Sequence, residues 1–187
     1  MLARYFITDR KSAGGIDAIA RNLAGGIDMI QIREKDLPAR ELAALVRRVM
    51  SLPNPGHTRI LVNERTDVAL ATGAHGVHLP SDAVSTARWR AVVPTDFLIG
   101  VSTHTLEEAI DAEWSGANFV VFGPVFAPIS KMSHLPPRGA GELARVCSAV
   151  RIPVFALGGI TVENAKLCEN AGAAGVAGIS VFTGKQK

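Results

Sequence analysis

A short apolar run followed by a helix-like segment recurs along this chain, and this alternation constrains the fold more than any other feature. Eight apolar runs are typical of strands, at residues 5–8, 29–33, 60–63, 76–79, 98–102, 119–122, 154–157 and 175–180. Helical periodicity marks seven segments between them, at 16–24, 39–51, 67–72, 85–92, 106–115, 141–150 and 162–170. Continuous apolar strands indicate a parallel sheet that is covered by helices.

The turns that lead from a helix into the next strand repeat a glycine. They read Gly26-Ile27-Asp28, Gly73-Ala74-His75, Gly116-Ala117-Asn118 and Gly172-Ala173-Ala174. Glycine tolerates the left-handed backbone that ends a helix, so one αβ unit is reused. Eight such units predict a single domain over residues 1–187, folded as a (β/α)8 TIM barrel. A doubly wound open sheet is the alternative, but no G-x-G-x-x-G motif follows the first strand.

The end of the chain departs from that pattern. Only residues 181–187 follow the last apolar run, so we expect the eighth helix to be short or missing. A neighbouring copy of the chain in a homo-oligomer is one way to cover the barrel there.

Composition narrows the functional classes. The chain is 48% hydrophobic with a net charge of +3, and no basic run is interleaved with aromatic residues, so nucleic-acid binding is not expected. No apolar run approaches the roughly 18 residues that a membrane helix needs, and no signal-peptide pattern opens the chain. Cys147 and Cys168 lack metal-type spacing and are expected to be reduced core residues. We therefore expect a cytoplasmic protein without a membrane span.

Polar side chains follow the second apolar run. Period-2 alternation places Gln31, Arg33 and Lys35 on one face of a strand that ends near residue 33. One amide and two cations aimed together suit a small polyanion such as a diphosphate, because arginine offers a planar fork and lysine a movable point charge.

Other predicted strands also end in polar residues, and in a barrel the C-terminal strand ends form the active site. These residues are Asp9, Asn63, Glu64, His78, Asp82, Ser102 and His104. His78 lies inside a strand, which suits a core histidine and a ligand contact equally. The 127–140 loop is long enough to act as a lid and carries Ser130 and Lys131. Gly159, Ile179 and Ser180 follow the last two strands, where barrels often hold phosphate.

Several motifs occur together in a specific order, among them Gln31-Ile32-Arg33-Glu34-Lys35, Val62-Asn63-Glu64-Arg65, Gly100-Val101-Ser102-Thr103-His104, Ala156-Leu157-Gly158-Gly159-Ile160 and Gly178-Ile179-Ser180. In these motifs the chain resembles the thiamine phosphate synthase and TenI family over nearly its whole length. The resemblance implies a barrel and, for the synthase branch, a transferase that joins hydroxymethylpyrimidine diphosphate to thiazole phosphate and releases pyrophosphate.

The same resemblance implies roles for individual residues. Arg33, Lys35, Ser102 and Lys131 match catalytic positions, and Gln31, Asn63 and Ser130 join them in binding the diphosphate substrate. Gly159, Ile179 and Ser180 match the thiazole-phosphate end.

The metal-binding motifs depart from the family pattern. An Asn-Asp pair is replaced by Asn63-Glu64, and the position of a second metal-binding Asp is taken by Ala83, with Asp82 one place early. The resemblance thus implies a Mg2+ site built from Glu64 and Asp82. We expect it to bind weakly, and Ala83→Asp to strengthen it.

Two alternatives remain at this point. A TenI-like thiazole tautomerase carries a catalytic histidine where this chain has Pro124, which removes the general acid/base. A non-catalytic binder of thiamine-pathway phosphates is compatible with the altered metal motifs.

Overall fold

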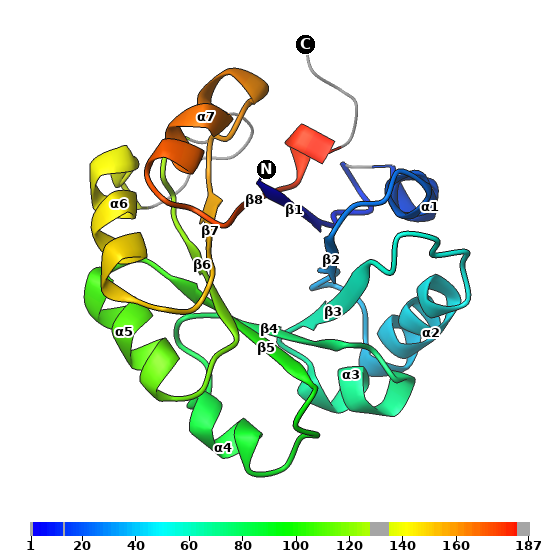
Figure 1. Ribbon diagram of the computed structural model, residues 1–187. Coiled ribbons are helices and arrows are strands. Elements are labelled where there is room, and N and C mark those ends of the chain that lie inside the picture. Colours follow the sequence, from blue (N-terminus) through cyan, green and yellow to red (C-terminus); the bar gives the residue numbers. More distant parts are fainter. Residues whose placement is uncertain (1, 13, 128–134, 183–187) are drawn as a thin grey trace.

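Eight parallel strands close into a barrel in the computed structural model (Figure 1). The structure describes residues 2–12, 14–127 and 135–182. The strands follow one another around the barrel in chain order, and β8 closes it by pairing with β1. They are β1 (Ala3–Ile7), β2 (Met29–Ile32), β3 (Arg59–Asn63), β4 (Gly76–Leu79), β5 (Leu98–Thr103), β6 (Phe119–Phe122), β7 (Val154–Leu157) and β8 (Gly175–Gly178). The predicted (β/α)8 barrel is confirmed.

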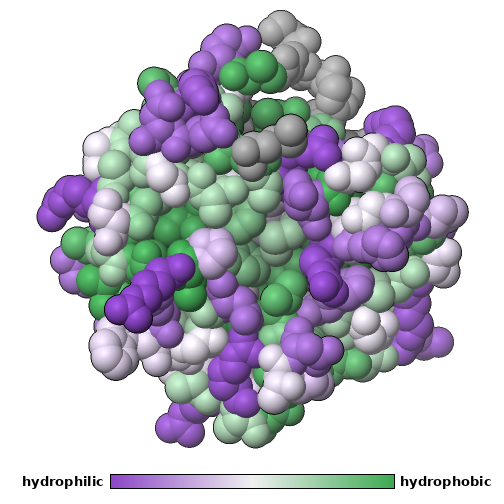
Figure 2. Space-filling model, viewed as in Figure 1, coloured by the Kyte–Doolittle hydropathy of each residue, from purple (hydrophilic) through white to green (hydrophobic). Residues whose placement is uncertain are grey.

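Seven helices surround the barrel within the described residues (Figure 1). They are α1 (Gly15–Ala24), α2 (Ala39–Met50), α3 (Thr66–Thr72), α4 (Thr86–Arg90), α5 (Leu106–Trp114), α6 (Gly139–Ala149) and α7 (Val162–Asn170). The predicted boundaries differ from these by no more than two residues. In the described part of the chain, no helix has the length and apolarity that a membrane crossing requires. Hydrophilic side chains dominate the outline of the face drawn in Figure 2, with hydrophobic residues mainly nearer its centre.

The strands separate two apolar cores. Side chains alternate across each strand, so Phe119 and Val121 of β6 point into the barrel while Val120 and Phe122 pack under the helices. The ring of Tyr5 meets Phe119 and Phe155 edge-on inside the barrel, with ring centroids 5.8 Å apart in both pairs. A layer of aromatic rings therefore fills the barrel interior.

Glycines on two strands make room for those rings. A Cβ atom at Gly100 would lie 2.2 Å from Cζ of Phe119, and one at Gly175 would lie 2.4 Å from Cε1 of Phe155. Real carbon atoms do not approach so closely, because interiors are already close-packed. These two glycines are therefore required by the size of the facing rings.

A 3₁₀ turn, Ser180–Phe182, follows β8. The Phe182 ring packs edge-on against Phe6, with centroids 6.4 Å apart, and the Asn22 side chain donates a hydrogen bond to the Phe182 carbonyl at 3.1 Å. Within the described residues, this turn takes the place where an eighth α-helix would begin, and it docks against α1 and β1.

Candidate active site

A cavity of about 340 Å³ opens at the C-terminal ends of the strands, and we call it the mouth cavity. Its walls come from β1 to β5, β7 and the segments that follow the strands. The lining residues are Ile7, Gln31, Arg33, Lys35, Asn63, His78, Pro80, Ser81, Ser102, His104, Leu157 and Ile179. The structure thus brings together most of the residues that the sequence proposed for substrate binding, although they come from separate units of the chain.

The side chains of Gln31, Arg33 and Lys35 face this cavity, as alternation predicted. Gln31 is buried on β2, whereas Arg33 and Lys35 lie beyond the end of the strand at Ile32. Arg33 makes no ion pair with any described residue. Its charge is therefore available to an anionic ligand. Lys35 Nζ, in contrast, lies 3.8 Å from a carboxylate oxygen of Glu64.

The loop that carries Arg33 is anchored by the buried carboxylate of Glu34. Thr8 Oγ1 donates to Glu34 Oε1 at 2.7 Å and accepts the backbone N–H of Arg33 at 2.9 Å. The backbone N–H of Arg10 also donates to Glu34, at 3.1 Å. Because Glu34 turns toward the loop after β1, its neighbours Arg33 and Lys35 are left facing the mouth cavity.

A surface ion pair ties the same two loops together. The Arg10 guanidinium reaches both oxygens of Asp36, at 2.6 and 2.8 Å, and Lys11 lies 2.8 Å from the same carboxylate. Hydrogen bonds from Arg10 and then Lys11 hold the pKa of Asp36 well below its usual range. The pair is exposed and contributes little net stability, but it commits the charges of Arg10 and Lys11 to Asp36.

A chain of hydrogen-bonded side chains from β1, β4 and β5 supports another part of the cavity wall. The Tyr5 hydroxyl lies 3.0 Å from His78 Nδ1, and His78 Nε2 lies 2.9 Å from Ser102 Oγ. A neutral imidazole donates from one nitrogen and accepts at the other, so His78 connects the two hydroxyls. Burial raises the pKa of the Tyr5 hydroxyl well above its usual value, and the nearby Gln31 side chain partly offsets that rise. His78 is thus a satisfied core histidine that positions Ser102 at the mouth cavity.

Burial, with a smaller contribution from the charge of Arg33, lowers the pKa of His78 to about 3 from an ordinary 6.5. The unfolded chain therefore takes up this proton at a higher pH than the folded chain does. The stabilising contribution is complete above pH 6.5 and is lost as the pH falls toward 3.

We expect this linkage to remove about 2 kcal/mol of unfolding free energy between pH 7 and pH 5. Urea unfolding of the wild type and of His78→Gln at both pH values measures it. The wild type should lose more stability than the variant by about that amount. Parallel losses would show that another group is responsible.

The two predicted metal ligands, Glu64 and Asp82, have different surroundings. Glu64 has a left-handed backbone (φ 64°), and its carboxylate is held by the Asn63 amide at 3.1 Å and Lys35 Nζ at 3.8 Å. Asp82 is exposed and does not line the mouth cavity. Within the described residues, no group of three or more His, Cys, Asp or Glu side chains could hold a metal ion. Of the two predicted carboxylates, Glu64 lies beside two residues that line the mouth cavity, and a magnesium site made by Glu64 and Asp82 stays a prediction.

The structure does not support the expectation for Ala83. Its methyl group packs against the core between strands and helices and lines a different pocket, outside the barrel. A carboxylate at this position would face that pocket, because the turn after β4 directs residue 83 outward.

The two glycines after β7 have a structural reason of their own. Gly158 and Gly159 both have positive φ, 99° and 62°, and a Cβ atom at Gly159 would lie 2.3 Å from the carbonyl oxygen of Ala127. The Phe126 N–H donates to the Gly158 carbonyl at 3.0 Å. Close packing against the segment after β6 thus explains both glycines without a ligand. Phosphate binding by Gly159, Ile179 and Ser180 stays a prediction, and of these Ile179 lines the mouth cavity.

Ser130 and Lys131, the two candidates on the long loop, lie outside the described residues. Sequence reasoning missed Tyr5, Thr8 and Glu34 as the groups that orient the site. A signal was present for Glu34, because alternation places it opposite Arg33 and Lys35, and a carboxylate on the buried side needs hydrogen-bond partners.

Comparison with known proteins gives the family. The thiamine monophosphate synthase family matches residues 4–182. The chain belongs to this family.

Thiamine-phosphate synthases that resemble it include that of Roseiflexus castenholzii, 41% identical over 96% of this chain and 80% of the relative. That of Methanospirillum hungatei is 41% identical over 94% of this chain and 87% of the relative. Among solved structures, thiamine phosphate pyrophosphorylase from Pyrococcus furiosus is 33% identical, with a TM-score of 0.87 over 98% of this chain and 89% of that one.

Proposed function

We propose that this protein is a thiamine-phosphate synthase, a transferase that joins hydroxymethylpyrimidine diphosphate to thiazole phosphate with release of pyrophosphate. The observation that carries the proposal is an Arg33 without an ion-pair partner among the described residues, which lies in one cavity at the mouth of the barrel with Lys35, Gln31, Asn63 and Ser102. Two cations and three neutral hydrogen-bonding side chains are suited to a diphosphate that must be held and then released.

The reaction breaks the C–O bond between the pyrimidine methylene carbon and the diphosphate, and forms a C–N bond from the thiazole nitrogen to that carbon. Negative charge grows on the departing pyrophosphate, and Arg33 and Lys35 stabilise it as it develops. Ser102, held by His78, fixes the orientation of the pyrimidine and diphosphate. The apolar wall, which includes Ile7 and Leu157, limits water and keeps the two rings together.

The proposal extends to Ser130 and Lys131 and to the residues that follow β7 and β8. Lys131 is proposed to add a third cation to the leaving diphosphate, and Ser130 a hydroxyl. Gly159, Ile179 and Ser180 are assigned to the thiazole-phosphate end, on the side of β7 and β8.

A tautomerase is the second candidate function, and one observation favours keeping it. His104 lines the mouth cavity with Nδ1 2.6 Å from the Gly123 carbonyl oxygen, next to Pro124. An imidazole at that position offers a general acid/base that Pro124 itself lacks.

One experiment separates the functions. Purified protein is incubated with both synthase substrates, with and without magnesium, and thiamine phosphate is measured. A separate reaction supplies thiazole carboxylate phosphate and follows its tautomerisation. Synthase turnover that is lost in Arg33→Ala supports the proposal. Tautomerisation alone would replace it with the second function, and tight pyrophosphate binding without either reaction would leave a non-catalytic binder.

Magnesium is proposed as a cofactor that binds with substrate. Glu64 would be one ligand, and substrate phosphate oxygens and water the others, since magnesium is often held by one or two carboxylates plus phosphates. When bound, the ion would neutralise charge on the diphosphate. Asp82 would contribute only after a change in the turn after β4.

We expect Glu64→Gln to raise the magnesium concentration for half-maximal rate about tenfold, because one charged ligand is lost. Ala83→Asp should leave it unchanged, because residue 83 faces the outer pocket. Magnesium titrations of the rate in wild type and both variants test this. A lower requirement in Ala83→Asp would restore the expectation drawn from sequence.

The remaining proposals concern the setting of the reaction. The small phosphorylated substrates and the two unpaired thiols, Cys147 and Cys168, fit a single-domain enzyme of the cytoplasm. Assembly into a homo-oligomer is proposed as a cover for the barrel beside the 3₁₀ turn.

A further inference from the structure

His104 is a half-buried imidazole in the wall of the mouth cavity. It directly follows β5, two positions after Ser102, so alternation turns both side chains to the same side of the barrel wall. Ser102 is assigned to the pyrimidine and the diphosphate. A group beside it on the same face is therefore placed to contact the same substrate.

The backbone after β6 fixes the tautomer of His104. Its Nδ1 atom lies 2.6 Å from the carbonyl oxygen of Gly123. A carbonyl oxygen only accepts hydrogen bonds, so Nδ1 carries a proton and donates it. A neutral imidazole has a single N–H, and Nε2 is therefore a bare acceptor. Within the described part of the chain, Nε2 of His104 forms no hydrogen bond.

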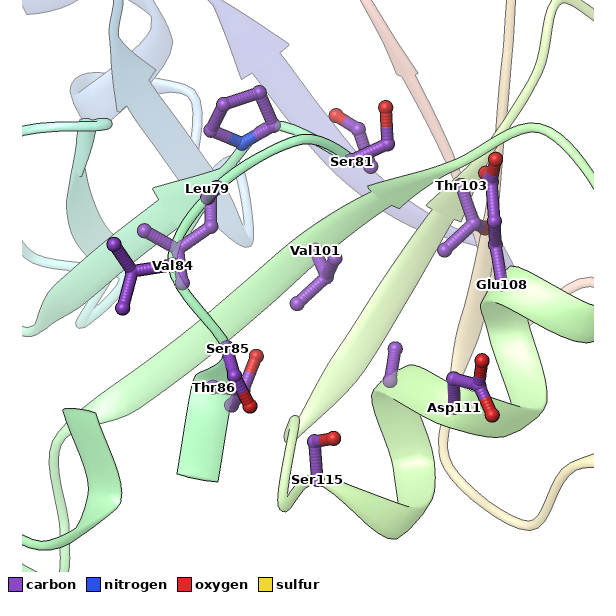
Figure 3. Close-up of a pocket in the computed structure, with 14 residues that line it drawn as sticks. Leu79, Ser81, Val84, Ser85, Thr86, Val101, Thr103, Glu108, Asp111 and Ser115 are labelled. Carbon is purple, nitrogen blue, oxygen red and sulfur yellow. The ribbon is translucent and has the colours of Figure 1, made fainter. Parts of the chain in front are cut away.

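The main chain of His104 is also held in place. Glu108 Oε2 accepts its backbone N–H at 2.6 Å. The Glu108 side chain extends from the first turn of α5 toward the end of β5, beside the pocket that Figure 3 shows. The backbone N–H of Glu108 in turn donates to the side chain of Thr105, which caps α5, at 3.2 Å. Because ring and main chain are both fixed, Nε2 is a preorganised acceptor.

The chemistry of the two proposed substrates identifies the donor that such an acceptor takes. Phosphate oxygens are themselves acceptors and carry negative charge, so they suit Arg33 and Lys35 and are not bound by a bare imidazole nitrogen. The thiazole of thiazole phosphate has no N–H. The pyrimidine carries an amino group on the ring carbon next to the one that bears the methylene, and this amino group is the N–H donor of the two substrates.

We propose that His104 Nε2 accepts a hydrogen bond from the amino group of the pyrimidine, which makes His104 a catalytic and specificity-determining residue. This inference rests on the proposed synthase function. As the C–O bond breaks, its electron pair leaves with pyrophosphate and the methylene carbon becomes electron-poor. The amino nitrogen donates electron density to that carbon through the ring, so its N–H becomes a stronger donor. The hydrogen bond to Nε2 therefore strengthens in the transition state, which raises kcat more than it lowers KM.

Isothermal titration calorimetry at pH 8, where histidine side chains are ordinarily neutral, tests the contact without turnover. The probes are hydroxymethylpyrimidine and its counterpart in which hydrogen replaces the amino group, each titrated in the presence of pyrophosphate. We expect the wild type to bind the amino compound about threefold to tenfold more tightly, which is the scale of one neutral hydrogen bond.

Variants of His104 assign that preference to the imidazole. His104→Phe keeps a ring but no acceptor, and His104→Ala removes the ring as well, so both should reduce the preference to less than about twofold. His104→Gln places an amide oxygen within similar reach and should retain it. In the synthase assay, His104→Phe should lower kcat about tenfold and change KM less than about threefold, and His104→Gln should recover most of the rate.

His57→Asn is the control, because His57 is an exposed histidine between α2 and β3. Its backbone is left-handed (φ 53°), which asparagine tolerates. This variant should match the wild type in both measurements.

Equal binding of the two pyrimidines by the wild type overturns the inference, even where thiamine phosphate is formed. A preference that His104→Phe and His104→Ala both retain, or that His57→Asn loses as well, overturns it too. Failure of the proposed function has a different signature. A chain that forms no thiamine phosphate and binds neither pyrimidine refutes the synthase assignment, and the role of His104 falls with it.

Discussion

Arg33→Ala is expected to weaken the binding of inorganic pyrophosphate by about 2–3 kcal/mol, which is roughly 30-fold to 150-fold in Kd. Arg33 lines the mouth cavity and has no carboxylate partner among the described residues, so its full charge is available to the ligand. Calorimetric titration of pyrophosphate into wild type and variant measures the loss.

Lys11→Ala is the matched control, because it removes the same charge from a neighbouring loop where Asp36 already neutralises it. It should change pyrophosphate affinity by less than about threefold, the range of exposed ion pairs. Thiazole phosphate should bind Arg33→Ala almost as well as wild type. Equal losses for both ligands, or for both variants, would contradict the assignment of Arg33 to the diphosphate.

Gly100→Ala is expected to lower the free energy of unfolding by about 3 kcal/mol, at the upper end of overpacking effects. The new methyl group would lie 2.2 Å from Cζ of Phe119. That ring cannot simply move, because it also packs against Tyr5, His78 and Phe155. Urea unfolding at neutral pH gives the difference.

Two further variants separate steric overlap from a general effect of replacing glycine. Gly141→Ala lies in α6 with nothing within 4 Å of the new Cβ atom, and it should be neutral or stabilising by up to about 1 kcal/mol. The double variant Gly100→Ala/Phe119→Leu should be more stable than the sum of the two single changes predicts, because leucine is shorter than the facing ring. A double variant less stable than the sum of both single changes would exclude the overlap as the cause.

Local sequence pattern was sufficient to predict the barrel. The alternation of apolar runs and helical segments, closed by turns such as Gly73-Ala74-His75, depends on interactions between residues close in the chain. For the same reason alternation placed Gln31, Arg33 and Lys35 on one side of β2, although the strand ends at Ile32. The C-terminal location of the polar residues then followed from the parallel arrangement.

The partners of the buried polar groups were not predictable in this way. Tyr5 and His78 are 73 residues apart, and His78 and Ser102 are 24 apart, yet they form one hydrogen-bonded chain. Nothing in the local pattern of β1 or β4 indicates which hydroxyl the imidazole meets. The curvature and closure of the barrel decide it.

The sequence by itself determined the number and order of the strands, the end of the barrel that carries the polar residues, and the family resemblance that names the chemistry. Only the tertiary structure decided which mouth-cavity cation has no ion-pair partner within the described part of the chain, which glycines are forced by facing rings, and that Ala83 faces outward. Periodicity is a property of neighbouring residues and can be read along the chain. Charge pairing, ring packing and the direction of a side chain after a turn depend on atoms that the fold brings together from distant segments.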